Sequence, residues 1–456
     1  MHRTLRTVTA ALLGLFLLTG SPAWTQDTAE PDTEDGPELD FGFGLGLGAR
    51  SFEEDGSTEV YQYASLYPTL SYGKLSAGLD LTLHYTFTGG DGQEFEVREE
   101  DWVPSDDRSL AEIYLAKLRF LQWAEQGDPL YARLGSLDGV TLGNGFIMGG
   151  YRNTQFLPDR RIVGVRLDLD GTRVGFPYLG LESMVANLAA FDLAGARLYV
   201  RPLAATDLPV VSGLEVGSTV AADLAPDYYA DKLDEDRRRG AARAFTDPDE
   251  VLLWGADLRL PVLTEPPFTL TAFTDFARQE EAQGGMIGAG GRVVRVITYD
   301  GRIRLNGENF LPVYFDAPYD LYRLQKYGVF EAEQTLIEEH IGWSATGGLS
   351  LFEDLLVLQV GAEGPFGSVE GAQNQLTGLL RLERGLVPSL SLEARYREVD
   401  IDSAWDLVDP DNSVIDARVT YHADPAAISL VYNLRYNPNT DEYVISSGIE
   451  SEITLR

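Results

Sequence analysis

Strict alternation of apolar and polar residues over Leu75 to Thr88 is the feature that most constrains what this chain can fold into. The apolar positions are Leu75, Ala77, Leu79, Leu81, Leu83, Tyr85 and Phe87, and the polar or small ones are Ser76, Gly78, Asp80, Thr82, His84, Thr86 and Thr88. A period of two puts one set on each face of an extended strand. Fourteen residues are long for a soluble strand but suit a tilted strand that crosses a membrane. The stretch therefore predicts a strand with one face toward lipid.

The same alternation recurs along the chain, most clearly at 390–397, 415–422, 428–436 and 445–455. Short turns are expected at 73–74, 170–171, 300–301, 353–354, 385–388 and 423–425, and longer polar segments at 89–109, 137–160, 224–250, 279–291, 316–340 and 399–412. Short connections at one end and long ones at the other are typical of outer-membrane barrels. The pattern predicts an all-β fold, a transmembrane antiparallel up-and-down β-barrel of about 16–20 strands formed by residues 40–456.

Residues 40–49 read DFGFGLGLGA, in which Phe41, Phe43, Leu45, Leu47 and Ala49 alternate with glycines. In a barrel the apolar side of this strand faces lipid. The side formed by Gly42, Gly44, Gly46 and Gly48 then faces the lumen and leaves room for a pore or for a loop folded inward. The alternative is a tightly packed edge strand in a soluble sandwich.

The N-terminus predicts export. A basic start, a short apolar run and Ser21-Pro22-Ala23 make residues 1–23 a signal peptide, and the acidic, aperiodic residues 24–39 are interpreted as a flexible periplasmic leader. The chain has no cysteine, which excludes a disulfide framework. Its net charge of −35 argues against nucleic acid as a partner.

Over nearly the whole mature chain, this pattern resembles a bacterial outer-membrane β-barrel of the porin type. The stretch YARLGSLDGVTLGNGFIMGGYRNT (Tyr131 to Thr154) is similar to porin and alginate-export-type barrels, in which a strand ending in Arg-x-Gly runs into a Gly-rich loop. Such barrels usually end in an aromatic residue, whereas this chain ends Thr454-Leu455-Arg456, and spirochaete-like outer membranes are one place to look for that ending. The resemblance implies a location in the bacterial outer membrane, contact with membrane lipid and insertion by the barrel-assembly machinery.

Charged residues of both signs occupy the predicted inner wall. Charges at membrane depth must face a wet or paired interior, and mixed rows of charge orient and filter polar solutes. The alternative is that the rows pair and brace the wall, and both readings stay open. The residues predicted to line a pore are Asp80, His84, Arg166, Arg197, Arg201, Arg259, Arg381, Glu393, Arg395, Arg418 and Arg435.

The segment 137–160 is predicted to fold into the barrel, because the apolar trio Phe146-Ile147-Met148 is poorly placed in an external loop and five glycines surround it. Its predicted constriction residues are Gly143, Asn144, Gly145, Phe146, Tyr151, Arg152 and Asn153. The last three are expected to face the solute, and Gly42 to Gly48 are hypothesised to provide room for the loop. An external loop packing its own small cluster is the alternative.

These observations favour a passive channel for small hydrophilic solutes, with no cofactor, no metal and no catalysis. A surface-exposed structural or adhesin barrel with a closed lumen is the alternative. An outer-membrane hydrolase that uses His84 or His422 is the third hypothesis. The sequence leaves the substrate, the strand count and the oligomeric state open.

Overall fold

The structure is a computed structural model that describes residues 39–54, 57–88, 94–105, 109–157, 160–206, 208–229, 248–399, 401, 413–424, 426–437 and 442–455. The predicted signal peptide (1–23) lies outside these residues, as do parts of the predicted loops 224–250 and 399–412. The predicted leader (24–39) also lies outside them except for Leu39, which begins the first strand.

Strands dominate the described chain. They are β1 (Leu39–Glu54), β2 (Ser57–Tyr72), β3 (Leu75–Leu79), β4 (Leu81–Thr88), β5 (Glu94–Val97), β6 (Leu118–Trp123), β7 (Leu130–Gly135), β8 (Gly164–Asp170), β9 (Leu179–Val185), β10 (Leu193–Val200), β11 (Glu215–Asp223), β12 (Val251–Leu263), β13 (Phe268–Gln279), β14 (Ala282–Val293), β15 (Ile297–Asn306), β16 (His340–Leu351), β17 (Leu356–Pro365), β18 (Gln375–Val387), β19 (Leu390–Val399), β20 (Ser413–Ala423), β21 (Ala426–Asn437) and β22 (Glu442–Leu455). The helices are η1 (Glu99–Asp101), α2 (Leu110–Leu115), η2 (Gly171–Val174), η3 (Val211–Gly213) and α4 (Tyr319–Phe330).

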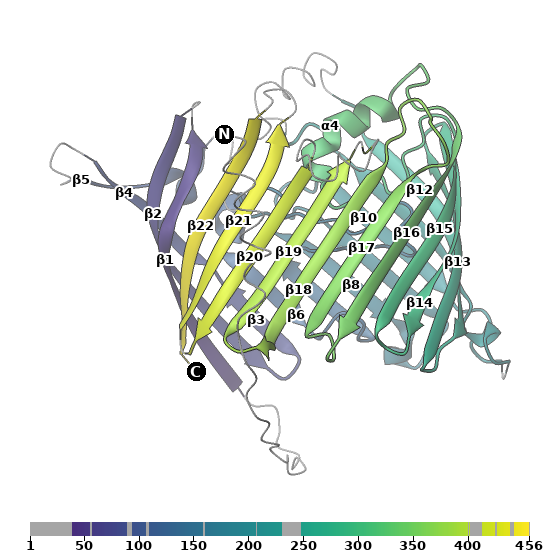
Figure 1. Cartoon of the computed structure of the whole chain (residues 1–456), viewed down its shortest axis with the longest axis horizontal. Coiled ribbons are helices and arrows are strands. Elements are labelled where there is room, and N and C mark those ends of the chain that lie inside the picture. The colour runs from purple at the N-terminus through teal and green to yellow at the C-terminus, as the bar shows by residue number, and fades with distance from the viewer. Residues whose placement is uncertain are drawn as a thin grey trace, which may run out of the picture. The chain divides into compact units, whose positions relative to one another are not determined.

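These strands form one antiparallel 22-stranded sheet in which neighbours in sequence pair except around β3 to β6, where β3 pairs with β6, and β1 pairs with β22 to close a barrel (Figure 1). β3 and β4 are two halves of one strand, since both continue the same register along β2. The break falls at Asp80, whose N–H donates to the Lys117 carbonyl over 2.8 Å. β5 pairs only with β4 among the described residues, which leaves 20 of the 22 strands in the closed circuit. The predicted all-β, antiparallel up-and-down barrel is confirmed.

Both ends of the sheet lie at the same end of the barrel, because Leu39 of β1 pairs with Tyr72 beside the 73–74 turn and Phe43 pairs with Leu455. We call this the turn end and the opposite one the loop end. Two sequence-based boundaries are wrong. Residues 300–301 lie inside β15, and 279–291 belong mainly to β13 and β14. The glycine-rich sequence of β14, AQGGMIGAGGRV, conceals the apolar alternation there.

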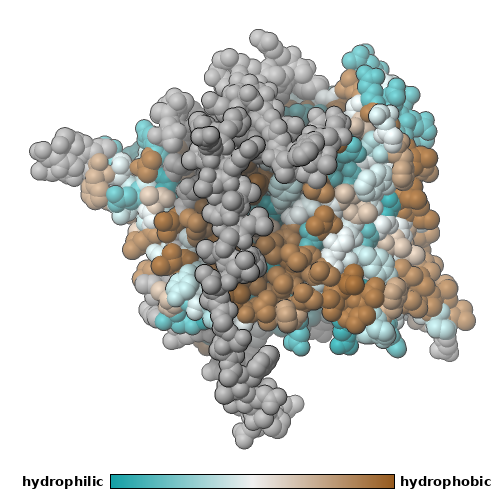
Figure 2. Space-filling view, viewed as in Figure 1, coloured by the Kyte–Doolittle hydropathy of each residue, from teal (hydrophilic) through white to brown (hydrophobic). Residues whose placement is uncertain are grey.

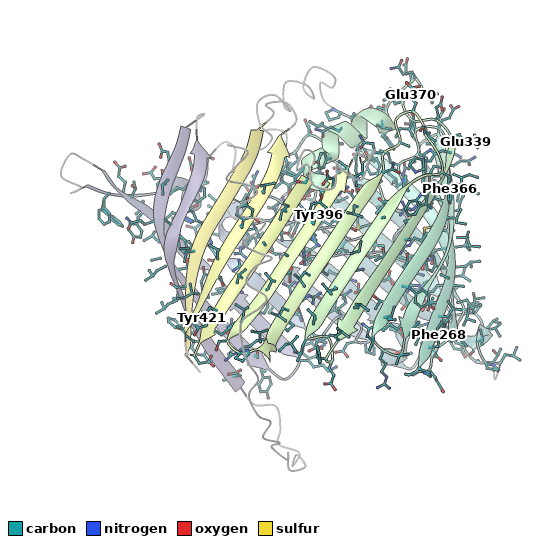
Figure 3. All side chains as sticks on the ribbon, in the orientation of Figure 1. Phe268, Glu339, Phe366, Glu370, Tyr396 and Tyr421 are labelled. Atoms are coloured by element: carbon teal, nitrogen blue, oxygen red, sulfur yellow. The ribbon has the colours of Figure 1, made fainter. Side chains whose placement is uncertain are left out.

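Apolar side chains gather on the outside of the barrel. Leu47, Ile303 and Ile449 are roughly half to two-thirds exposed, at 61%, 48% and 61%, and Figure 2 shows a continuous apolar area over the visible strands. Exposed aromatic residues lie near the strand ends, with Phe268 and Tyr421 toward the turn end in Figure 3. An apolar band bounded by aromatic residues is typical of a lipid-facing surface. No helix of the described residues is long and apolar enough to span a membrane.

Two adjacent leucines near the middle of β18 test the assignment of faces. Leu379 pairs with Arg395 on the lumen side, and Leu380 pairs with Leu358 on the outer side. Replacing Leu380 with Arg is expected to lower the free energy of unfolding in lipid by ~2–4 kcal/mol, because the charge enters hydrocarbon. Leu379→Arg should cost much less, since its side chain meets water. Equal losses in the two variants, measured by urea titration in liposomes, would contradict the assignment.

The glycine side of β1 faces inward, but none of the described residues of an inward-folded loop fills it. In register Gly48 lies opposite Tyr63 and Gly44 opposite Tyr67, both on β2. A Cβ at Gly46 would come within 2.9 Å of the Tyr67 ring, and one at Gly48 within 2.6 Å of the Tyr63 hydroxyl. The glycines therefore accommodate two tyrosine rings from the neighbouring strand, an arrangement that compensates for glycine in sheets. The hypothesis that Gly42 to Gly48 make room for the 137–160 segment is wrong.

Candidate functional site

Two long connections at the loop end fold into the barrel. We call residues 136–163, between β7 and β8, inner loop 1, and residues 307–339, between β15 and β16, inner loop 2. Their apolar side chains form one buried cluster with lumen-facing residues of β9 to β14. The cluster contains Leu137, Val140, Leu142, Phe146, Ile147 and Met148 of inner loop 1, Phe310, Tyr314, Phe315, Tyr319 and Tyr327 of inner loop 2, and Met184, Leu193, Ala221, Leu253, Ala277 and Met286 of the wall.

Glycines of the wall make room for this packing. A Cβ at Gly195 of β10 would come within 2.9 Å of Leu142, and one at Gly255 of β12 within 3.0 Å of Ile147. At Gly284 of β14 the Phe310 ring would be 2.4 Å away. The close approach that the sequence suggested for β1 therefore occurs on β10, β12 and β14. On β10 and β12 a single glycine stands among larger residues and gives no visible pattern.

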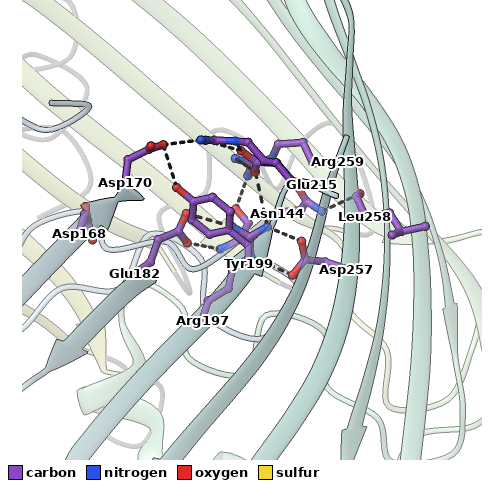
Figure 4. A network of polar contacts seen from close by, with 12 residues as sticks. Asn144, Asp168, Asp170, Glu182, Arg197, Tyr199, Glu215, Asp257, Leu258 and Arg259 are labelled. Carbon is purple, nitrogen blue, oxygen red and sulfur yellow. Dashed lines mark hydrogen bonds and ion pairs between the residues drawn. The ribbon is translucent and has the colours of Figure 1, made fainter. Parts of the chain in front are cut away.

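The tip of inner loop 1, Gly143-Asn144-Gly145, lies deep in the lumen in a polar network (Figure 4). The Gly143 N–H donates to Glu182 (2.8 Å), and its carbonyl accepts from Arg259 (2.6 Å). The Asn144 amide donates to Asp275 (3.0 Å), and its side-chain oxygen accepts from Arg259 (2.9 Å). Arg259 is the ninth residue of β12, so the tip reaches roughly 26 Å along that strand from the loop end.

Backbone geometry explains why glycines flank Asn144. Gly143 and Gly145 have φ values of 58° and 83°, in the left-handed region that favours glycine. A Cβ at Gly143 would also lie 2.9 Å from the Arg197 guanidinium. Any other residue at 143 would therefore displace the tip from the wall.

Arg197 is the centre of a brace beneath the tip. It is fully buried, and its guanidinium donates to Asp257 (2.6 and 2.9 Å) and Glu182 (3.1 Å). Toward the turn end, Arg201 bridges Asp170 (2.7 Å) and Glu215 (2.8 Å). These arginines hold strands β8 to β12 together, which is the bracing role that the sequence left open beside the filtering role.

Inner loop 2 adds a short parallel pairing to inner loop 1, because Met148 bridges Phe315 and the Val313 N–H donates to the Phe146 carbonyl (2.8 Å). The sequence analysis placed 316–340 among the outer loops and missed this inward fold. A signal was present just before that segment and at its start. Phe310, Tyr314, Phe315 and Tyr319 form an aromatic group that, like Phe146-Ile147-Met148, is poorly placed in an external loop.

A buried ionic cluster fixes helix α4 of inner loop 2 to the wall. Arg323 donates to Asp223 at the end of β11 (2.5 and 2.9 Å) and to Asp192 beside β10 (2.7 Å). Tyr151 of inner loop 1 donates to Asp320 of α4 over 3.0 Å. All five side chains are almost completely buried. The cluster therefore joins both inner loops to the same wall.

Titration in this cluster follows from its burial. Burial raises the pKa of Asp320 to about 7, against the opposing effect of Arg323. Burial also raises the pKa of Asp192. Burial acts to lower the pKa of Arg323, but Asp223 and Asp192 together raise it well above its ordinary value. The cluster thus keeps a charged arginine and a carboxyl at Asp320 that is partly protonated near neutral pH.

Among the described residues, the two inner loops leave the opposite wall, β18 to β21, largely uncovered. Asp138 of inner loop 1 reaches across to Arg395 of β19 (3.2 Å) and also pairs with Arg152 (2.8 Å), while Arg395 pairs with Glu393 (2.8 Å). The Asp138 and Glu393 side chains are 51% and 40% exposed, and Arg152 and Arg395 about a quarter. Water-accessible charges of both signs therefore remain between inner loop 1 and this wall.

The residues predicted to line a pore differ in exposure according to the part of the barrel wall on which they lie. Arg166, Arg197 and His84 are buried. Arg201, Arg259 and Asp80 are partly exposed, and Asp80 pairs with Arg161 of inner loop 1. Glu393 and Arg395 lie on the uncovered wall with Arg381 and Arg418, which are partly exposed and exposed, respectively. The side chain of Arg435 lies outside the described part of the chain.

The predicted constriction residues also separate. Phe146 packs in the buried cluster, and Gly143, Asn144 and Gly145 form the tip. Tyr151 and Asn153 do not face a solute, because both are buried and Asn153 bonds to the backbone of Leu137 and Ala186. Of the three residues expected to meet solute, Arg152 alone is partly exposed. The prediction for Tyr151 and Asn153 was wrong because their polar groups are buried against partners that are distant in sequence. Tyr151 bonds to Asp320 of inner loop 2, and Asn153 bonds to the Ala186 carbonyl beside β9.

No family model matches this chain, and no curated protein matches it. Solved structures similar to it include OpdO of Pseudomonas aeruginosa, with 10% identity over 92% of this chain and 97% of that chain and a TM-score of 0.37. Another is Wzi, an outer membrane protein involved in group 1 capsule assembly in Escherichia coli and a carbohydrate-binding β-barrel. It has 10% identity over 91% of this chain and 84% of that chain, with a TM-score of 0.37. OccAB4 of Acinetobacter baumannii has 12% identity over 93% of this chain and 100% of that chain, with a TM-score of 0.35. This is a likeness to outer-membrane barrels at low identity, and the assignment of the fold rests on this chain's own strand pairing.

Proposed function

We propose that this protein is a bacterial outer-membrane channel for the passive diffusion of small hydrophilic solutes, narrowed by inner loops 1 and 2. The asymmetry of the interior is the observation that supports it. The loops bury β9 to β14, whereas the wall from β18 to β21 keeps accessible charges on Glu393, Arg395 and Arg418. Covering these charges as well would cost desolvation free energy, so their accessibility supports a water-filled space beside this wall.

The contact between Asp138 and Arg395 stands across the proposed path, where inner loop 1 reaches β19. In planar bilayers the refolded protein is expected to give stable single-channel currents. Arg395→Glu replaces attraction to Asp138 with repulsion, so we expect a higher conductance and a shift of reversal potential toward cation selectivity. Arg384→Glu is the matched control, because Arg384 is 53% exposed and pairs with Asp424 near the turn end of the outer face.

The closed structural or adhesin barrel remains the alternative, and it is favoured by the ion pairs that tie both inner loops to β19, namely Asp138 to Arg395 and Asp316 to Arg397 (3.1 Å). Absence of current from correctly folded protein would support it and contradict the channel. The finer resemblance to alginate-export-type porins and spirochaete-like membranes stays a prediction.

The hydrolase hypothesis has less support. His84 Nδ1 lies 2.6 Å from a carboxylate oxygen of Asp101, and His422 Nε2 lies 2.9 Å from the Ser391 hydroxyl. The two pairs stand on β4 and β20, which are separated by β21, β22, β1 and β2. A serine, a histidine and an acid in one chain of hydrogen bonds are needed for this chemistry. These two pairs do not combine into one.

A further inference from the structure

The hairpin formed by β4 and β5 extends beyond the closed circuit of strands. β4 pairs with β2 from Leu81 to Tyr85 and with β5 from Tyr85 to Thr88. In Figure 1 these two strands project sideways from the barrel wall, nearer to the loop end than to the turn end. We call this part of the hairpin, residues 85–88 and 94–97, the wing.

One face of the wing is aromatic and the other is polar. Tyr85 lies opposite Val97, and Phe87 lies opposite Phe95. The three aromatic rings contact one another, with centroids 5.4 to 5.8 Å apart. Phe87 and Phe95 are nevertheless 53% and 54% exposed, and Glu96 is exposed on the opposite face. The wing is therefore an amphipathic two-stranded ribbon that presents an aromatic surface outside the barrel.

The aromatic face of the wing continues the outer face of the barrel. Leu83 lies opposite Ala64, and Ala64 lies opposite Leu47, which is 61% exposed on the outer face. Tyr85 and Phe87 follow Leu83 at steps of two residues, so they lie on the same face of β4. The apolar outer surface thus passes from the wall onto the wing.

The outward bend of β4 changes the direction in which this face points. On the wall, the outer face is directed away from the barrel axis. Because β4 bends outward near the loop end (Figure 1), the same face on the wing is directed toward the turn end, and the face that carries Glu96 is directed away from it. An amphipathic segment at a membrane surface lies in this way, with its apolar side toward the acyl chains and its polar side toward water.

The wing leaves the wall at the height expected for a membrane surface. Leu75 begins β3 at the turn end, and Tyr85 is ten residues further along, a distance of about 33 Å in an extended strand. A strand tilt of about 40° reduces this to roughly 25 Å along the barrel axis, which is the height of the apolar band in membrane barrels. Tyr72 is 51% exposed at the turn end. Aromatic side chains therefore stand at both boundaries of the band, as they do at membrane interfaces.

A buried polar group fixes the base of the wing to the wall. Arg98 follows β5, and its backbone N–H donates to the His84 carbonyl over 3.0 Å. Its guanidinium donates to Asp101 (3.1 Å) and lies over the Phe52 ring of β1, 4.0 Å from the ring centroid. A carboxylate oxygen of Asp101 also lies 2.6 Å from His84 Nδ1. Arg98, His84 and Phe52 are buried, so the direction of the wing is set by packing inside the barrel.

We propose that the wing is a membrane-interface anchor, whose aromatic face binds lipid at the boundary between head groups and acyl chains of the loop-end leaflet. Tyr85, Phe87 and Phe95 are the residues that contact the lipid. A second copy of the chain is the competing occupant. The two half-exposed phenylalanines offer roughly 200 Å², well below the ~800 Å² that each partner buries in a stable protein interface. The inference rests on the proposed location in a membrane and does not depend on whether the barrel conducts.

Single cysteines can test the proposal, because the chain has no cysteine of its own. A polarity-sensitive bimane label is attached to the F95C variant, with E96C on the opposite face as the matched control, and each protein is reconstituted in phosphatidylcholine liposomes. Phosphatidylcholine that carries a nitroxide near the head-group end of its acyl chain should quench the label at position 95 several-fold more than the label at position 96. Iodide in the buffer should show the reverse preference.

Heat-modifiable migration on gels shows that both variants are folded, and no current is measured, so a barrel that does not conduct leaves this test intact. Equal quenching by iodide at positions 95 and 96 would overturn the proposal, since the wing would then lie in water. If the label at position 95 is shielded from both quenchers and becomes accessible to iodide on dilution to one barrel per liposome, a second copy covers the wing, which also overturns it.

Labelling in native membranes distinguishes lipid from a partner protein. A membrane-impermeant maleimide should modify E96C and spare F95C there, which is the pattern expected in liposomes of pure protein and lipid. Protection of F95C in native membranes together with its full modification in liposomes would show that another protein covers the aromatic face, and would overturn the proposal.

Discussion

Deleting Leu142–Met148 from inner loop 1 should raise the single-channel conductance at least about twofold, because current through a pore follows its open cross-section. The deletion removes the tip held by Arg259 and the apolar residues that anchor inner loop 2 through Phe315. The barrel should persist, since its strands are held by ladders that do not include these residues. Planar-bilayer recording measures the conductance, and circular dichroism in detergent measures the strand content.

A deletion at the opposite end provides the control. Residues Leu203–Thr206 connect β10 to β11 at the turn end and belong to neither inner loop. Removing them should leave the conductance close to that of the unmodified protein. If deletion of Leu142–Met148 also leaves it unchanged in a correctly inserted barrel, inner loop 1 does not limit the current.

Replacing Arg323 with Leu should cost ~3–5 kcal/mol of the free energy of unfolding, because it leaves Asp192 and Asp223 buried without their cation. Both carboxylates are 1% exposed or less, and Arg323 is their shared partner. The variant should also release α4, which would appear as new protease cleavage between Tyr319 and Phe330 in intact proteoliposomes. Urea titration in lipid measures the loss of stability.

Two further variants distinguish the effect of breaking the buried ion pairs from the effect of removing any charged side chain. Arg292→Leu removes an arginine that is 48% exposed, so its cost should stay below about 1 kcal/mol. Asp320→Asn should also be mild near neutral pH, because burial raises the pKa of Asp320 to about 7 and an amide oxygen still accepts from Tyr151. A loss for Arg323→Leu no larger than that for Arg292→Leu would show that the cluster does not hold α4.

Sequence patterns succeeded where the environment of each residue alternates. Along Leu75 to Thr88 the lipid and the lumen impose different side chains on the two faces, so the strand and its faces are visible in the order of residues, even across the break at Asp80. The same reasoning failed over β14, where glycines replace most lumen-facing side chains: Gly284 lies against the Phe310 ring and Gly288 against the Phe273 ring. A pattern that depends on a partner far away in sequence cannot be read locally.

In the interior, too, local sequence predicted one feature and missed another. Composition around Phe146 suggested that inner loop 1 folds inward, because apolar residues in a glycine-rich loop need a place to be buried. Which wall receives the loop is a separate question, and the glycines of β1 seemed the natural answer. The receiving wall is instead β9 to β14, since Tyr63 and Tyr67 already occupy the inner face of β1.

From the order of its residues alone, this chain specifies a closed β-barrel with an apolar outer face and a charged inner face, because lipid and water act on every second residue. Contacts between distant segments decide which inner charges are buried braces and which stay accessible. Arg197 and Arg395 look alike in sequence, yet Arg197 lies beneath the tip of inner loop 1 and Arg395 lies on the uncovered wall. The reason is physical: a side chain's access to water depends on what covers it, and the inner loops that cover β9 to β14 join the barrel wall only in the folded protein.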